Sequence, residues 1–246
     1  MTIQTLPPAI PTLDLELALA TRCGPGPRIV VGIDEVGRGA LAGPVAVGAC
    51  AIEVTGGRAA ALPEGVRDSK ALTARRRELL VEPIRAAARS TAVGWSEPAE
   101  IDELGIMRAL TLAALRAIDA LEVTADAIIL DGSVDVLTPD LSRRAVPCPR
   151  VELRVKADRD CASTAAASIL AKVARDQRMT ELDALAPAYG WAANKGYGSA
   201  VHRRAIQDHG LTAHHRRSWN LGGQAPVLPG VLWDDQSSPQ PGKERR

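Results

Sequence analysis

Two adjacent carboxylates, Asp34 and Glu35, interrupt the most apolar stretch of the chain, RIVVGIDEVGRGALAGPVAVGACAI, which covers residues 28–52. Apolar runs of this kind are typical of buried strands. A buried carboxylate without a partner costs roughly several kcal/mol, so such a strand needs a compensating positive charge nearby. The pair therefore indicates a site that binds cations, although Glu35 alone fits a solvent-facing strand end equally well.

Two further carboxylates follow apolar segments later in the chain. Asp131 ends the run AIILD, and Asp158 follows VELRV in the segment KADRD. Carboxylates at strand ends can meet at one edge of an α/β sheet, where such sheets build their sites. Four carboxylates in one place repel each other and need a divalent cation to remain ionised. Oxygen ligands alone predict magnesium or manganese, held by Asp34, Glu35, Asp131 and Asp158.

The adjacency of Asp34 and Glu35 constrains how they share a site, because neighbouring residues on a regular strand point to opposite faces. We therefore expect the strand to end or bulge at this pair. Gly37 and Gly39 favour a sharp turn there, since glycine tolerates the backbone angles that a turn requires. A third possibility is that one of the two residues contributes its backbone carbonyl.

Strand-like and helix-like patterns alternate along the chain. Strands are expected at residues 28–34, 43–52, 91–97, 125–132 and 150–158, with the first two paired as a hairpin. Helices are expected at residues 12–21, 71–89, 105–121, 163–185 and 199–210. Ser163 or Thr164 is expected to cap the fourth helix. This order predicts an α/β fold with a mixed sheet.

The chain divides into four parts on these patterns. Residues 1–27 form a helical lead-in, residues 28–186 the α/β domain with the carboxylates, and residues 187–221 a small helical appendage. Residues 222–246 are rich in Pro, Gly and Ser, and we expect them to be disordered. Aromatic residues make up 2% of the chain and Phe is absent, so the core is expected to consist of Ala, Val, Leu and Ile.

Charge and cysteine content narrow the class of protein. The net charge is +1, so any attraction to nucleic acid has to come from local clusters of basic residues. The four cysteines have no C-x-x-C spacing, which favours reduced thiols over disulfides or zinc ligands. No apolar run reaches the ~18 residues that a membrane helix needs. We therefore expect a cytoplasmic protein without a membrane partner.

Six ordered blocks between residues 29 and 219 together resemble the type 2 ribonucleases H (ribonuclease HII): GIDEVGRGALAGPVAVGACAI, DSKALTARRRELL, ILDG, VKADRDCASTAAASILAKVARDQRM, YGWAANKGYGSAVHRRAI and GLTAHHRRSW. The resemblance implies a ribonuclease H-like mixed β-sheet flanked by helices, with a C-terminal helical appendage. It implies an endoribonuclease that cuts 5′ of ribonucleotides in RNA–DNA hybrids and at single ribonucleotides embedded in duplex DNA. Two Mn²⁺ or Mg²⁺ ions would serve the reaction, which leaves a 3′-hydroxyl and a 5′-phosphate. A monomer is expected, and the resemblance names no protein partner.

The same resemblance assigns the acidic residues. It makes Asp34, Glu35, Asp131 and Asp158 the catalytic, metal-binding set. Asp160 is a weaker candidate. Asp68 lies in a family block outside the acidic set, and a structural or loop-ordering role suits it better. The family often has glycine where this chain has Ala157, and alanine fits unless the position needs a positive φ.

The resemblance also assigns substrate contacts. The loop Gly37-Arg38-Gly39 would contact the 2′-hydroxyl, the group that distinguishes RNA from DNA, and Tyr197 would pack on the next sugar. Without the resemblance, a tyrosine packed on the appendage is the simpler interpretation. The basic run at 214–217 could widen the phosphate-binding surface, with its histidines structural or close to phosphate. Further contacts to phosphates are expected from Ser69, Lys70, Lys156 and Lys195.

Three other interpretations compete with this one. The segment GRGALAG does not form a P-loop, because Pro44 follows Gly43 where that motif has Lys and then Ser or Thr. A type 1 ribonuclease H or a resolvase would share the carboxylates but lack the blocks DSKAL and KGYG. A nucleic-acid-binding module with structural acidic residues would bind duplexes without metal and cleave nothing.

Overall fold

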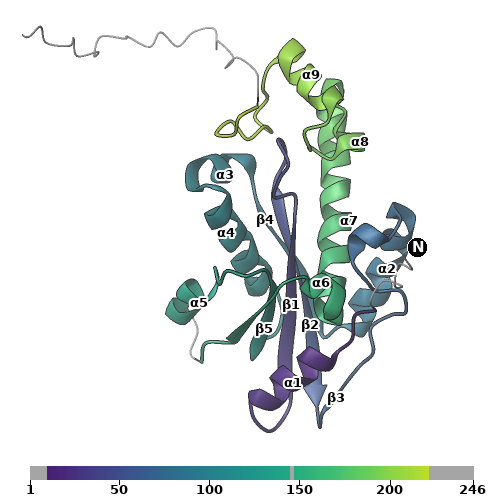
Figure 1. Cartoon of the computed structure of the whole chain (residues 1–246), viewed down its shortest axis with the longest axis vertical. Helices are drawn as coiled ribbons and strands as arrows, with labels where there is room; N and C mark the ends of the chain where they lie inside the picture. Colours follow the sequence, from purple (N-terminus) through teal and green to yellow (C-terminus); the bar gives the residue numbers. More distant parts are fainter. Residues whose placement is uncertain (1–9, 145–146, 222–246) are drawn as a thin grey trace, which may run out of the picture.

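The computed structural model describes residues 10–144 and 147–221, in which a mixed sheet stands between helices on both of its faces (Figure 1). The sheet order is β3-β2-β1-β5-β6, and β4 also pairs with β2. β1 and β2 form an antiparallel hairpin, whereas β1–β5 and β5–β6 are parallel, which confirms the predicted mixed sheet. The strands are β1 (Arg28–Val36), β2 (Val45–Thr55), β3 (Arg58–Ala59), β4 (Ser90–Ser96), β5 (Ala127–Asp131) and β6 (Arg150–Arg154).

The predicted helices are present, with shorter elements between them that the sequence patterns did not indicate. The segment expected as a strand over residues 150–158 is a strand only to Arg154, and a short helix follows it. The α-helices are α1 (Asp14–Arg22), α2 (Ala74–Ala87), α3 (Pro98–Leu104), α4 (Ile106–Asp119), α5 (Thr138–Arg144), α6 (Ala157–Asp160), α7 (Ala162–Leu185), α8 (Trp191–Asn194) and α9 (Ala200–His209), and the 3-10 turns are η1 (Ser69–Ala71) and η2 (Pro187–Tyr189).

Two apolar layers hold the sheet between its helices. Because side chains alternate along a strand, Val30 of β1 packs with the layer of α1, α2 and α7, and Val31 packs with the layer of α4. The buried apolar side chains of both layers are almost all Ala, Val, Leu and Ile, as the composition predicts. None of the helices within the described ranges is long and apolar enough to cross a membrane.

Glycines of β1 and β2 face helix α7 and leave room for its backbone. A Cβ atom at Gly32 would lie 2.3 Å from the Thr164 amide nitrogen, and one at Gly48 would lie 2.1 Å from the Ala167 carbonyl oxygen. Any side chain at these two positions would therefore collide with the helix backbone. The contact brings Ser168 of α7 close to the end of β1, where it affects the ionisation of Asp34.

A carboxylate from the N-terminal lead-in caps α7. The helix begins at Ala162, and the Ser163 amide donates a 2.8 Å hydrogen bond to Oε1 of the buried Glu16. The prediction that Ser163 or Thr164 caps this helix is wrong, since both lie inside it. The lead-in also bonds on either side of the helix start, from the Thr12 amide to the Asp160 carbonyl and from the Ala162 amide to the Thr12 carbonyl.

Glu16→Ala is expected to lower the free energy of unfolding by about 1–3 kcal/mol, because it leaves a buried helix amide without an acceptor. Glu16→Gln should lose less, since its amide oxygen can still accept the bond. Urea unfolding measures both changes. Glu82→Ala, at an exposed glutamate of α2, is the control and should stay within about 0.5 kcal/mol of wild type. Equal stabilities of the two alanine variants would contradict the capping role.

The C-terminal appendage packs on the end of α7. Tyr189 stacks on the buried Trp191 at 5.0 Å between ring centroids, and the Trp191 indole donates to His202 Nε2 at 3.0 Å. His202 in turn lies 3.2 Å from His215, whose pKa burial lowers to about 4. His202 and His215 are therefore structural, and for His215 this agrees with one of the two interpretations of the histidines in residues 214–217. The predicted disordered segment, residues 222–246, lies outside the described residues.

Candidate active site

Asp34 and Asp131 lie side by side toward the carboxyl-terminal ends of the neighbouring strands β1 and β5, here called the sheet edge. The strands are parallel, and Ile33 pairs with Leu130, so the next residue on each strand is a carboxylate. Asp131 Oδ1 accepts a 3.0 Å hydrogen bond from the Ala157 amide, which ties it to the start of α6. Asp158 is the next residue of that helix. Three carboxylates distant in sequence thus meet at one edge, as the strand-end argument predicts.

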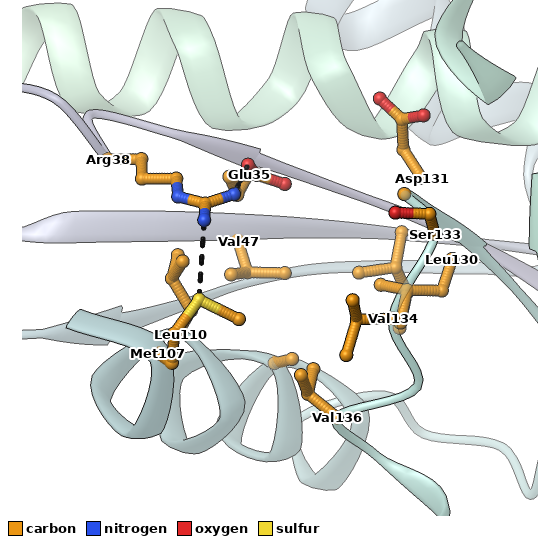
Figure 2. A pocket seen from close by; sticks show the side chains of 13 residues that line it. Glu35, Arg38, Val47, Met107, Leu110, Leu130, Asp131, Ser133, Val134 and Val136 are labelled. Carbon is orange, nitrogen blue, oxygen red and sulfur yellow. Dashed lines mark hydrogen bonds and ion pairs between the residues drawn. The ribbon is translucent and has the colours of Figure 1, made fainter. Parts of the chain in front are cut away.

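Glu35 reaches the same edge from the opposite face of the sheet. β1 continues regularly to Val36, which pairs with Ala46, so the expected strand end or bulge at Asp34 and Glu35 does not occur. Glu35 instead lines an apolar pocket on the α4 side with Leu110. In Figure 2 the Asp131 carboxyl points away from the apolar side chains of this pocket. As neighbours on a regularly paired strand, Asp34 and Glu35 therefore point to opposite faces of the sheet.

Burial and neighbouring negative charges raise the pKa of Asp34, Glu35 and Asp158. Asp34 is 6% exposed, and burial, together with the charges of Glu35, Asp131 and Asp158, raises its pKa to about 7, while the Ser168 hydroxyl acts in the opposite direction. Burial is also the main cause that raises the pKa of Glu35 and of Asp158. The edge of the sheet therefore favours a bound proton or a bound cation over four free negative charges.

Two side-chain cations compensate part of this charge. Lys70 Nζ lies 3.2 Å from Asp158 Oδ2 and 3.7 Å from Asp68 Oδ1. Arg38 Nη1 lies 3.8 Å from Glu35 Oε1, and Nη2 of the same arginine contacts the Met107 sulfur at 3.3 Å, a contact drawn in Figure 2. Within the described ranges, no group of three or more Asp, Glu, His or Cys side chains is already arranged to hold an ion.

The donor chemistry nevertheless fits a hard divalent cation. All four side chains offer carboxylate oxygens, which magnesium and manganese prefer. Asp34 is buried among three like charges, an arrangement that a nearby divalent cation would stabilise. The cations that now face Asp158 and Glu35 have exposed side chains, 77% for Lys70 and 55% for Arg38, so both are free to move aside.

The residues predicted to contact substrate differ in how far they are exposed. Arg38 and Gly39 are exposed at the tip of their loop, whereas Gly37 is buried with φ +88°. Tyr197 is 38% exposed. Lys156 is exposed and itself adopts the positive φ of this segment, while Ala157 is helical. Alanine therefore fits where the family often has glycine.

Ser69 and Lys195 contact other parts of the protein. Ser69 is buried, and its hydroxyl accepts a 2.9 Å hydrogen bond from Ser168, so its side chain faces the protein interior. Lys195 Nζ donates to the Asp176 carbonyl and to Thr180 Oγ1 on α7, at 3.2 and 3.0 Å. The structure thus places these two side chains against the protein.

Two other aspartates of these segments have separate roles. Asp68 accepts the Lys70 amide at 2.9 Å and caps η1, as expected of a loop-ordering residue. Asp160, the weaker acidic candidate, forms an ion pair with Arg154 at 2.7 Å. Asp160 thus lies outside the carboxylate group, whereas Asp68 shares Lys70 with Asp158 and its charge helps to raise the Asp158 pKa.

Sequence reasoning missed two arginines behind the glycine-rich loop. Arg175 and Arg216 are both fully buried, so the interpretation of residues 214–217 as a basic surface is wrong for Arg216. For Arg175 a signal was available: it occupies the same helix face as Ala171, Met179 and Leu182, which are all buried. An arginine at the apolar spacing of a helix indicates a buried charge with a defined set of partners.

Comparison with known proteins agrees with this geometry. The family model described as Ribonuclease HII matches residues 31–221. A ribonuclease HII of Streptomyces avermitilis is 46% identical over 209 residues, which is 85% of this chain and 83% of the relative. A ribonuclease HII of Paracoccus denitrificans is 45% identical over 194 residues, 79% of this chain and 86% of the relative.

Solved structures show the same fold. The ribonuclease H2 of Pyrococcus horikoshii OT3 aligns with a TM-score of 0.58 and 26% identity, over 78% of this chain and 94% of that one. The structure of a PCNA:RNase HII complex from Archaeoglobus fulgidus aligns with a TM-score of 0.59 and 28% identity, over 80% and 98%. The chain therefore belongs to the ribonuclease HII family, the type 2 ribonucleases H, which are metal-dependent endonucleases acting on RNA–DNA hybrids.

Proposed function

We propose that this protein hydrolyses the phosphodiester on the 5′ side of ribonucleotides, both in RNA–DNA hybrids and at single ribonucleotides in duplex DNA. The products are a 3′-hydroxyl and a 5′-phosphate. The observation that carries the proposal is the burial of Asp34 beside Asp131 and Asp158 at one sheet edge, which raises the Asp34 pKa to about 7. In the cell, this activity would remove ribonucleotides from DNA and degrade RNA primers in the cytoplasm.

Asp34, Glu35, Asp131 and Asp158 would hold Mn²⁺ or Mg²⁺, two ions during catalysis. A pair of such ions activates the attacking water and stabilises the leaving oxygen of an in-line displacement. Lys70 would exchange its contact with Asp158 for a substrate phosphate, since its side chain is 77% exposed. Arg38 is available for a phosphate in the same way.

Recognition of the ribonucleotide is assigned to the loop Gly37-Arg38-Gly39 and to Tyr197. The exposed tip of the loop can approach a sugar closely, because a Cβ atom at Gly39 would meet nothing within 4 Å. Lys156 and Lys195 would add phosphate contacts that fix the register of the duplex without reading its bases. For Lys195 this requires its ammonium group to leave the Asp176 carbonyl.

A duplex DNA with one embedded ribonucleotide tests the proposal. With Mg²⁺ or Mn²⁺, a single nick should appear on the 5′ side of that ribonucleotide and produce a 3′ end that a DNA polymerase extends. An all-DNA duplex of the same sequence should stay intact. Folded protein that leaves the ribonucleotide duplex uncut, or that nicks both duplexes, would refute the proposed activity.

Tyr197→Ala is expected to lower kcat/KM at a single embedded ribonucleotide by about tenfold, because it removes a ring that packs on nucleotide. The free energy of unfolding should fall by less than about 1 kcal/mol, since the ring is 38% exposed. Steady-state cleavage and urea unfolding measure the two quantities. An unchanged kcat/KM would return Tyr197 to the structural role, packed on the appendage, that is the simpler interpretation without the family resemblance.

A further inference from the structure

The guanidinium of the buried Arg216 donates hydrogen bonds to backbone carbonyls of the glycine-rich loop, residues 37–44. Its Nη1 donates to the Arg38 carbonyl at 2.8 Å, and its Nη2 donates to the Gly37 carbonyl at 2.7 Å. Nη2 and Nε also donate to the Gly43 carbonyl, at 3.1 and 3.2 Å. The planar fork thus joins the start of the loop to its end.

Arg175 of α7 makes a similar set of bonds beside it. Its Nε donates to the Pro44 carbonyl at 2.9 Å, and its Nη2 donates to the Ala42 carbonyl at 3.3 Å. Its Nη1 reaches the Lys195 carbonyl at 2.9 Å, and its guanidinium lies 5.5 Å from the centre of the Tyr197 ring. Arg175 therefore connects the glycine-rich loop with the loop that carries Tyr197.

Neither arginine pairs with a carboxylate in the described part of the chain. Removing two cations from water without an ionic partner is costly, and a buried apolar pair of similar volume would commonly be more stable. Stability alone therefore does not account for two guanidiniums at this place. What they supply is a set of directed hydrogen bonds.

The bonds of Arg216 fix the direction of two consecutive peptide groups. In a trans peptide, the carbonyl of one residue and the amide of the next point in opposite directions. The Gly37 and Arg38 carbonyls point inward at Arg216, so the amides of Arg38 and Gly39 point outward. Both residues are exposed, and neither amide donates to another residue within the described ranges.

The arginines also explain why the loop begins with glycine. A Cβ atom at Gly37 would lie 2.1 Å from Arg175 Nε, and the residue has φ +88°. A side chain would therefore be strained and would also displace the guanidinium. Gly37 thus leaves room for the guanidinium groups of Arg175 and Arg216 behind the loop. Gly39 leaves the outer side of the loop open.

We propose that Arg216, supported by Arg175, is a positioning residue that sets the specificity for ribonucleotides. By holding two carbonyls inward, it presents the Arg38 and Gly39 amides to a sugar hydroxyl oxygen, an acceptor that deoxyribose lacks at its 2′ position. This inference rests on the proposed cleavage at ribonucleotides. It assigns the discrimination between ribose and deoxyribose to two buried arginines that do not contact the nucleic acid.

Arg216→Lys tests this, because lysine keeps the charge but cannot form the bidentate fork. The holoenzyme with Mg²⁺ is assayed for KM on a duplex with one ribonucleotide and for the Ki of an all-DNA duplex as competitor. The variant should raise KM about tenfold, as expected for about 1.4 kcal/mol of lost hydrogen bonding. The Ki for all-DNA duplex should stay within about twofold, because phosphate contacts are unchanged.

Equal rises of KM and Ki, or a fall in kcat alone, would overturn the specificity role. Arg178→Lys makes the same chemical change at an exposed arginine of α7 and should alter neither constant. If urea unfolding shows that Arg216→Lys does not fold, Arg175→Lys takes its place. A lowered ratio of Ki to KM in that variant supports the positioning role of the two arginines, and an unchanged ratio refutes it. Wild-type protein without cleavage would instead refute the proposed function itself.

Discussion

Asp34→Asn is expected to lower cleavage of a ribonucleotide-containing duplex by about a thousandfold or more and to leave the protein folded. This loss is expected because the amide would remove a charged ligand from the proposed metal site, and such charge stabilisation supplies roughly several kcal/mol of the barrier reduction. The fold survives because the amide is neutral, whereas the ionised Asp34 carboxylate is so unfavourable in its buried place that its pKa rises to about 7. Single-turnover cleavage and thermal unfolding measure the two effects.

Asp160→Asn is the matched control for this experiment. It makes the same change at an aspartate two residues from Asp158, in an ion pair with Arg154 outside the carboxylate group. It should keep near-normal cleavage. Substantial turnover by Asp34→Asn, or an equal loss in both variants, would show that the buried carboxylates are not the ligands.

Mn²⁺ or Mg²⁺ is expected to stabilise the wild-type protein and to be required for cleavage. A cation that binds the folded state alone adds about 2.7 kcal/mol to the free energy of unfolding at a hundredfold excess over its Kd. The physical reason is the mutual repulsion of Asp34, Glu35, Asp131 and Asp158, which a cation relieves. Urea unfolding with increasing metal, and cleavage after addition of a chelator, measure the two parts.

The stabilisation should disappear in Asp131→Asn and persist in Asp160→Asn. This pair separates a specific site from general screening of negative charge, which would affect both variants alike. A full metal response in Asp131→Asn would place the ion elsewhere. A chelated enzyme that still cuts the duplex would remove metal from the reaction.

Local patterns were sufficient to predict that carboxylates gather at the ends of neighbouring strands. Asp34 and Asp131 each end an apolar run, and parallel neighbouring strands bring such ends together, so their proximity follows from sequence and topology. The mixed sheet follows from the order of strands and helices. The direction of Glu35 does not, because only the continuous pairing of β1 with β2 as far as Val36 shows that the strand does not bulge.

Contacts between distant segments could not be predicted. Ser163 looked like a helix cap, but Glu16 supplies the acceptor from 147 positions away in the chain. Arg216 looked like part of an exposed basic run, but it is buried against carbonyls 173 to 179 positions away. In both cases residue type indicated a need for a partner, while the partner depended on packing that no local pattern encodes.

The close seat of α7 on Gly32 and Gly48 makes this helix a single stiff rod, about 36 Å long at 1.5 Å per residue over its 24 residues. Ser168 of this helix lies beside Asp34, and Arg175 lies about two turns further on, where it bonds to the glycine-rich loop at the Pro44 carbonyl. A methyl group at Gly48 would push the helix away from the sheet, because it would overlap the Ala167 carbonyl. The carboxylate site and the glycine-rich loop would then both be displaced, although the added methyl group contacts neither.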